Sequence, residues 1–532
     1  MSIIDRMTSL SAPFARAAGL AVSLVVATSM LSACGGGGGD PTRFTSDTGA
    51  NSGATTPVTP TNPTTPTTPT TPAATPDPIP ADFMSYQNLC AVPRTGVDTY
   101  GTPFPDRQGT MQDEMKFLRG WADRYYLWYD EIPATVRMAD YTNVLDYFGA
   151  LKTPAVTASG KPKDRFHFTY TTAEWDAMNT AGEEVGYGLT WSTSSSKAPR
   201  TWLAAIVEPG SPAAQAGLQR GDMLTAVDGT DFVNTSSREG VDKLNAGLFP
   251  AGAGERHTLT VQRSGNTIAV TMDAAVVASS SVKNTKVIDT PTGRVGYLTF
   301  DDHNAVAEKQ LIDAFTQLKA QNVSDLVIDM RYNGGGLLYI ASELAYMVAG
   351  PASNGQTFER LSYNDKTAPE APIPFRNTAY GFPAPNPAPA GQALPYLGLK
   401  HVTVLATADT CSASEAVING LRGIDVQVDV IGGQTCGKPY GFTPVDNCGT
   451  TYFSIEFAGV NAKGFGDFAD GFAPTCMVAD DLSRAVGDPA EGMLAAALAY
   501  RASGTCPTSR AKMVAMKLAR PQAKEIAVLP RR

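Results

Sequence analysis

Short apolar stretches alternate with helix-like stretches between residues 294 and 438, and this alternation restricts the fold more than any other feature of the sequence. The predicted strands are Arg294–Phe300, Asp325–Met330, His401–Thr407 and Val426–Ile431. The predicted helices between and after them are Ala305–Leu318, Leu337–Val348 and Ala413–Arg422. Apolar strands that alternate with helices are typical of a mostly parallel sheet covered on both faces. The sequence therefore predicts an α/β domain here.

Two polar residues follow consecutive strands of this pattern. Ser412 stands where the strand 401–407 turns into a helix, and Lys438 ends the glycine-rich loop after the strand 426–431. One helix and one strand separate them, so both could emerge at the same edge of the sheet. A serine hydroxyl needs a neighbouring base, and a lysine acts as a base only when its amine is neutral. Burial favours the neutral amine and can lower its pKa by up to ~3–5 units. We interpret Ser412 as a nucleophile and Lys438 as its base; the alternative is a helix cap and a solvated lysine.

The motifs around both residues resemble those of the C-terminal processing (tail-specific) serine proteases. They read Ser-Ala-Ser-Glu at 412–415 and Gly-Gly-Gln-Thr-Cys-Gly-Lys at 432–438. The resemblance implies a crotonase-like catalytic core in which Ser412 attacks and Lys438 removes its proton. It also implies supporting roles for Glu415 and Thr435.

One position departs from this family. Many members carry a Gln or Glu four residues after the lysine, where it orients the amine. In this chain that position is Phe442. The group that orients the lysine is therefore not evident from the sequence.

A triple glycine follows the strand 325–330. The run Arg331–Gly336 connects this strand to a helix, and glycines let backbone N–H groups approach a ligand closely. The resemblance implies that Gly335, rather than Gly334, forms the oxyanion hole together with Ala413. Such donors are worth ~3–4 kcal/mol each to a developing oxyanion. The alternative is a tight connector without a catalytic role.

The stretch 185–275 resembles a PDZ domain. Its first signature is a loop before a strand, made of Gly186, Tyr187, Gly188 and Leu189. The second is the run of small residues and glycines from 207 to 218. Backbone N–H groups of such a loop capture a C-terminal carboxylate while the peptide adds as a strand. The resemblance implies that protein or peptide substrates, recognised by their C-termini, bind at these four residues.

The N-terminus has the features of a bacterial lipoprotein signal peptide. An apolar run ends in Leu-Ser-Ala-Cys, which resembles the lipobox and predicts lipidation of Cys34. An ordinary secretory cleavage is the alternative. We expect lipid anchoring in the periplasm, at the outer rather than the inner membrane because Gly35 follows the cysteine. A net charge of −9 argues against nucleic acid as a partner.

These features divide the chain into consecutive parts. The predicted parts are a signal peptide (1–33), a Gly then Thr/Pro-rich linker (34–81), a small N-terminal helical region (82–180), a PDZ domain (181–278), a serine protease catalytic domain (279–504) and a C-terminal tail (505–532). The expected function is a lipid-anchored periplasmic serine endopeptidase that cleaves unfolded or C-terminal protein segments.

Two alternatives to this function stay open. His303 follows a strand end beside Asp301 and Asp302, so a serine triad that uses His303 as the base is possible. A non-catalytic, PDZ-containing binding scaffold is the other, because the resemblance also implies the same fold for relatives that bind without cutting. No set of His, Asp or Glu has metal-ligand spacing, so we predict neither a metal nor a cofactor.

Six cysteines remain besides Cys34, and they allow fifteen pairings. An oxidising periplasm permits disulfides. Cys411 directly precedes the candidate nucleophile, and Cys436 lies two residues before the candidate base. A Cys411–Cys436 bridge that clamps the two catalytic loops is therefore our hypothesis.

Overall fold

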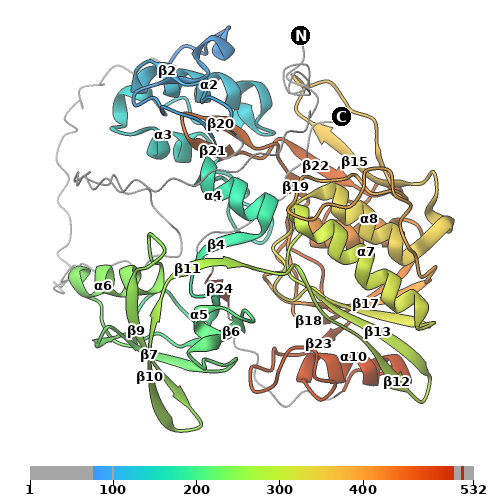
Figure 1. Cartoon of the computed structure of the whole chain (residues 1–532). Helices are drawn as coiled ribbons and strands as arrows, with labels where there is room; N and C mark the ends of the chain where they lie inside the picture. The colour runs from blue at the N-terminus through green and yellow to red at the C-terminus, as the bar shows by residue number, and fades with distance from the viewer. Residues whose placement is uncertain (1–75, 99–100, 508–516, 520–532) are drawn as a thin grey trace, which may run out of the picture.

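The computed structural model describes residues 76–98, 101–507 and 517–519. The predicted N-terminal region, PDZ domain and catalytic domain follow one another along the chain, coloured from blue to red in Figure 1, and are called the N-terminal, PDZ and catalytic parts below. The predicted signal peptide, Cys34 and the linker up to residue 75 lie outside the described residues. Within the described residues, no helix has both the length and the apolar character needed to cross a membrane.

The central sheet of the catalytic part has the strand order β12-β13-β14-β17-β18-β23. Its strands are β12 (Val282–Thr290), β13 (Gly293–Phe300), β14 (Asp325–Asp329), β17 (His401–Ala406), β18 (Gln427–Gly432) and β23 (Cys476–Met477). Neighbouring strands are parallel except β12, which pairs antiparallel with β13. The predicted α/β architecture is confirmed, and the strands begin and end within about one residue of the predicted limits.

Helices cover both faces of this sheet. They are α7 (Ala305–Ala320), α8 (Leu338–Ala349), α9 (Ala413–Gly423) and α10 (Gly492–Ser503). Alternate residues of a strand point to opposite faces. Ile328 and Val404 therefore join the core under α7, α8 and α9, whereas Val327 and Leu405 join the core under α10. This alternation explains why the strands are apolar throughout.

A smaller sheet follows the order β16-β15-β22-β19 and lies beside α9. Its strands are β15 (Thr357–Tyr363), β16 (Ile373–Pro374), β19 (Tyr440–Gly441) and β22 (Phe457–Val460). Lys438 lies two positions before Tyr440, where β19 begins, so the candidate base directly precedes the edge strand of this sheet.

The N-terminal part is helical but also contains strands. Its longer helices are α2 (Met111–Tyr125), α3 (Val144–Ala150) and α4 (Thr172–Asp176). Thr110 and Asp113 form a capping box that starts α2. The strand β3 (Phe168–Thr171) pairs with β21 (Thr450–Phe453), which pairs with β20 (Val445–Asn447). The N-terminal part is thus joined to the catalytic part by a shared sheet.

The PDZ part has its own core and the sheet order β10-β9-β7-β6-β5-β24. The strands are β5 (Leu189–Thr193), β6 (Trp202–Val207), β7 (Met223–Val227), β9 (Arg256–Arg263), β10 (Asn266–Asp273) and β24 (Lys517–Ala519). The helices are α5 (Pro212–Gln215) and α6 (Arg238–Leu248). The strands β4 (Glu183–Gly186) and β11 (Ala275–Ala278) pair where the chain enters and leaves this part.

The last strand, β24, belongs to the stretch 505–532 that we predicted as a C-terminal tail. It pairs antiparallel with β5 of the PDZ part, and Figure 1 shows it between the PDZ strands and the catalytic part. The description of 505–532 as only a tail therefore needs correction, because part of it completes a sheet.

Candidate active site

The nucleophile candidate lies in a strained turn. Ser412 connects the loop after β17 to the first residue of α9, and its φ of 63° is in the left-handed region that non-glycine residues avoid. A hydrogen bond from the N–H of Cys411 to the carbonyl of Asn333 (3.0 Å) helps to hold this loop in place. Ser412 is 1% exposed. Such strain at a strand-to-helix turn is typical of functional residues.

A buried carboxylate joins the serine to the lysine loop. Glu415 Oε2 accepts the backbone N–H groups of Ser412 (3.0 Å) and Lys438 (2.8 Å). Glu415 Oε1 accepts the N–H of Gly437 (2.9 Å) and the hydroxyl of Thr435 (2.5 Å). Burial raises the pKa of Glu415, while its four donors oppose that shift. The structure thus brings together four residues that the sequence predicted for the site.

The lysine side chain lies in an apolar enclosure. Lys438 is 1% exposed, and its Nζ lies 4.3 Å from the ring centre of Phe442 and 4.9 Å from that of Phe166. Burial holds the pKa of Lys438 well below its usual range, although the charges of Asp164 and Glu415 act in the opposite direction. A neutral amine is therefore favoured here. Phe442, at the position where a polar residue was expected, forms part of the enclosure.

The N-terminal part supplies residues that the sequence did not reveal. Arg165 Nη2 donates to the carbonyls of Cys436 (2.8 Å) and Gly437 (3.3 Å), which fixes the lysine loop. Asp164 is buried, accepts the Tyr126 hydroxyl (2.8 Å), and has a lowered pKa despite its burial. An ionised carboxylate thus acts on Lys438 from another part of the chain. Only the tertiary fold brings these segments together, so no local pattern could have revealed them.

The triple-glycine loop lies against the nucleophile. A Cβ atom added to Gly335 would come within 2.7 Å of Ser412 Cβ and 3.0 Å of Ala413 N, so only glycine leaves this space open. The N–H of Gly335, however, donates to Asn333 Oδ1 (2.9 Å). In this conformation the N–H of Gly335 is therefore bound to a side chain, and its role as an oxyanion donor stays a prediction. Ala413 begins α9, whose N-terminal N–H groups face the turn.

The alternative base, His303, faces a different environment. Its Nδ1 lies 3.0 Å from Asn333 Oδ1, and its ring packs against Phe300. Its Nε2 has no hydrogen-bond partner among the described residues. Burial lowers the pKa of His303 to about 3. The Ser-His-Asp triad uses a carboxylate to orient the imidazole, and the amide of Asn333 occupies that place here.

The hypothesised Cys411–Cys436 disulfide is present and crosses directly between the two catalytic loops. Other disulfides among the described residues join Cys90 to Cys448 and Cys476 to Cys506. Cys411, Glu415 and Cys436 lie close enough together to suggest a metal site. Because the two sulfurs are joined, they offer no thiolate ligands.

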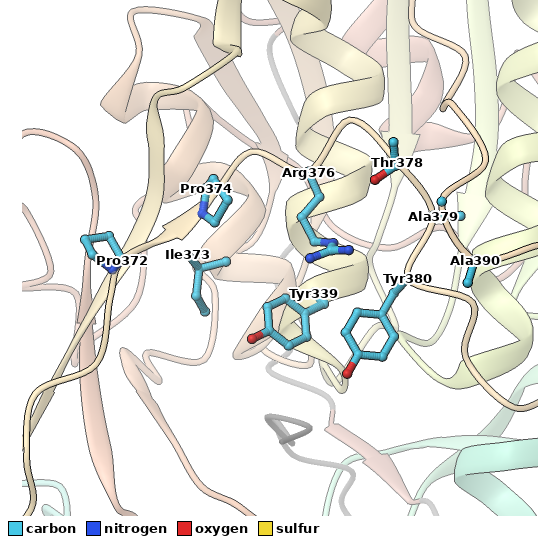
Figure 2. A pocket seen from close by; sticks show the side chains of 10 residues that line it. Tyr339, Pro372, Ile373, Pro374, Arg376, Thr378, Ala379, Tyr380 and Ala390 are labelled. Carbon is cyan, nitrogen blue, oxygen red and sulfur yellow. The ribbon is translucent and has the colours of Figure 1, made fainter. Parts of the chain in front are cut away.

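A pocket of about 420 Å³ opens at the start of α8, the helix that follows the triple glycine. Figure 2 shows the Arg376 side chain reaching into it toward Tyr339 and Tyr380. The guanidinium lies 5.4 and 5.2 Å from the two ring centres. Glu343, 3.8 Å from Arg376 Nε, has a pKa that burial raises well above its usual range. The pocket thus presents the guanidinium of Arg376, which suits a carboxylate.

The predicted peptide-binding residues lie at one corner of the PDZ part. Gly186 ends β4, and Leu189 begins β5. Tyr187 is buried, and its carbonyl accepts the N–H of Ala213 (3.0 Å). Gly188 has a φ of 71°, and a Cβ there would lie 2.4 Å from Ser211 Cβ. Gly188 therefore has a backbone angle and a close contact that favour glycine, and the role of these four residues in peptide binding stays a prediction.

Three segments of the chain match known protein families. Residues 294–463 match peptidase family S41, residues 205–263 match the PDZ domain, and residues 113–170 match the peptidase S41 N-terminal domain. The first match contains the triple-glycine loop, the serine turn and the lysine loop.

Individual relatives are similar over part of the chain. The carboxyl-terminal-processing protease of Picosynechococcus sp. is 30% identical over 174 residues, which cover 32% of this chain and 39% of that protein. The chloroplastic C-terminal processing peptidase of Tetradesmus obliquus is 31% identical over 186 residues, which cover 32% of this chain and 38% of that protein. The chain therefore spans about two fifths of the length of these curated relatives.

A solved structure extends the similarity of fold. A Bacteroides fragilis protein assigned to the S41 proteases superposes with a TM-score of 0.56 at 25% identity. The match covers 73% of this chain and 97% of that one.

Proposed function

The chain carries a peptidase family S41 domain and a PDZ domain, and from this premise we propose that the protein is a serine endopeptidase that cleaves unfolded or C-terminal protein segments. The observation that carries the proposal is the shared carboxylate oxygen of Glu415, which holds the backbones of Ser412 and Lys438 side by side in a buried site. The depressed pKa of the lysine gives this pair the chemistry of a nucleophile and its base.

In the proposed mechanism, neutral Lys438 takes the hydroxyl proton of Ser412 as the serine oxygen attacks the scissile carbonyl. The N–H of Ala413 stabilises the oxyanion, joined by that of Gly335 once it leaves Asn333. The ammonium of Lys438 then gives its proton to the leaving amine. The neutral amine of Lys438 then takes a proton from water as the water oxygen attacks the acyl-enzyme carbonyl. The acyl product leaves as the Ser412 oxygen takes that proton back from Lys438. The parallel sheet that carries these loops at the carboxyl ends of β14, β17 and β18 supports a crotonase-like core.

Substrate recognition is assigned to the PDZ part. The loop Gly186–Leu189 leads directly into β5, which is the arrangement that captures a chain end and adds it as a strand. Protein or peptide substrates are the partners that this arrangement supports.

We also propose a localisation for the protein, in the periplasm and attached to a membrane by a lipid. The Leu-Ser-Ala-Cys sequence that ends at Cys34 supports lipid anchoring of a periplasmic enzyme. The disulfides of the described residues support an oxidising compartment. Metabolic labelling with an alkynyl fatty acid tests this: we expect incorporation in the wild type and none in Cys34→Ala. Equal labelling of both proteins would exclude an anchor at this cysteine.

The experiment that tests the proposed function is digestion of casein by the wild type, by Ser412→Ala and by the control Ser503→Ala, whose serine lies on α10. Cleavage by the wild type and the control, and none by Ser412→Ala, is the expected result. A folded wild type without activity would favour the non-catalytic binding scaffold. Cleavage that survives Lys438→Met but is lost in His303→Gln would favour the histidine triad.

A further inference from the structure

The edge of the PDZ sheet is occupied by the chain itself. Lys517, Leu518 and Ala519 form β24, which pairs antiparallel with β5 so that Lys517 lies opposite Thr193 and Ala519 opposite Trp191. Without β24, β5 would be the edge strand of this sheet. An edge strand offers unpaired backbone groups that bind an extended peptide. The segment therefore fills the place at which a peptide would add to this sheet.

The direction of β24 matches that of a bound chain end. Because the strands are antiparallel, the carboxyl end of β24 points toward Leu189, where β5 begins. Leu189 closes the loop to which the proposed function assigns capture of a C-terminal carboxylate. The segment thus follows the path that a C-terminal peptide takes in strand addition to a sheet edge.

A second contact places β24 against the nucleophile turn. The N–H of Leu518 donates to both carboxylate oxygens of Asp409 (3.3 and 3.2 Å). Asp409 lies three residues before Ser412. Successive backbone N–H groups of a strand point to opposite sides. The N–H of Leu518 therefore points away from β5 when the N–H groups of its two neighbours point toward β5. The segment therefore bridges the PDZ edge and the loop that carries the candidate nucleophile.

We propose that the C-terminal segment around Lys517–Ala519 is an internal ligand of the PDZ domain and competes with the chain ends of substrates for β5. This inference rests on the peptide-binding role in the proposed function, but not on catalysis. The disulfide between Cys476 and Cys506 fixes the chain to β23 eleven residues before Lys517. A tether of this length keeps the segment at a roughly millimolar effective concentration near its site. A substrate must therefore displace it before it can bind.

The test measures binding in the full chain, with Ser412→Ala present in every protein so that no peptide is cut. A fluorescent decapeptide of unrelated sequence with a free C-terminal carboxylate is the probe, and its Kd is read by anisotropy. The double variant Lys517→Pro/Ala519→Pro removes two backbone donors from β24. The control Ala523→Pro/Lys524→Pro changes the same residue types outside β24.

The expected result is a Kd about fivefold or more lower in the β24 variant, with the control equal to the parent protein. Hydrogen exchange of the Trp191–Thr193 amides should become faster in the same variant. An unchanged Kd together with unchanged exchange would overturn the proposal. Faster exchange with an unchanged Kd would also overturn it, because the segment would then pair with β5 without competing. Every protein in this test carries Ser412→Ala, so the measured Kd does not depend on proteolysis. The result would therefore stay interpretable even if the wild type cleaved nothing.

Discussion

The backbone N–H groups of Ser412 and Lys438 donate to the same carboxylate oxygen, Glu415 Oε2, at 3.0 and 2.8 Å. The two nitrogens therefore lie no farther apart than the sum of these distances. A single buried side chain thus sets the relative position of the backbones that carry the proposed nucleophile and base. The disulfide between Cys411 and Cys436 joins the same two loops by a covalent bond. The site is held by two independent links, and each has its own consequence.

Removal of the Cys411–Cys436 bridge should reduce both stability and activity. We expect the double variant Cys411→Ser/Cys436→Ser to lose about 3 kcal/mol of unfolding free energy and much of its kcat. The pair Cys476–Cys506 closes a loop of similar length, with a sequence separation of 30 against 25. Its double serine variant is the matched control, which should lose similar stability but keep its kcat. Denaturant unfolding and casein kinetics check both. Equal loss of kcat in both variants would show that the first bridge has no special role.

Asp164 should set the pH at which the enzyme becomes active. Its charge raises the pKa of Lys438, so Asp164→Asn should lower that pKa further. Because the neutral amine is the active form, the acidic limb of kcat/KM should move to lower pH. Asp289→Asn, at an exposed position, is the control and should leave the acidic limb of kcat/KM at the same pH. A limb that stays fixed or moves to higher pH in Asp164→Asn would contradict the predicted interaction.

Burial of Lys438 as a neutral amine should lower the free energy of unfolding at neutral pH. Between its lowered folded pKa and its ordinary value near 10.5, the unfolded chain binds a proton that the folded chain does not. Stability therefore rises with pH across this window. Lys438→Met should raise Tm by roughly a few degrees at pH 7, and its advantage over the wild type should shrink toward pH 10. Calorimetry at several pH values, with exposed Lys243→Met as the control, checks the sign. A lower Tm for Lys438→Met at pH 7 would mean that the lysine is charged and paired.

The sequence predicted the central sheet and the two catalytic loops well, because their signals are local. Apolar strands and glycine-rich turns show their structure within a few residues. Asp164 and the strand β24 gave no such signal, since the lysine on which Asp164 acts and the strand with which β24 pairs both lie hundreds of residues away in the sequence. Gly335 shows a third limit: its place beside Ser412 was predictable, but the hydrogen bond from its N–H to Asn333 depends on a side-chain conformation.

Arg376 should favour substrates that carry a carboxylate near the cleaved bond. Tyr339 lies four residues after Gly335, so the pocket wall is at most ~15 Å along the chain from the glycine that contacts Ser412. We expect Arg376→Met to lower kcat/KM about tenfold for a peptide with a nearby Glu and much less for its Gln counterpart. Arg360→Met on β15 removes the same charge at an exposed position and is the control. An equal loss for both peptides would assign the pocket a structural role instead.

The most direct test of the central claim is covalent labelling by a fluorophosphonate, with the site mapped by mass spectrometry across a range of pH. The account predicts one adduct, on Ser412, whose rate of formation rises with pH as Lys438 loses its proton. Lys438→Met should abolish this adduct while the protein stays folded. An adduct on Ser412 that forms equally fast in Lys438→Met, or an adduct on another serine, would contradict the account.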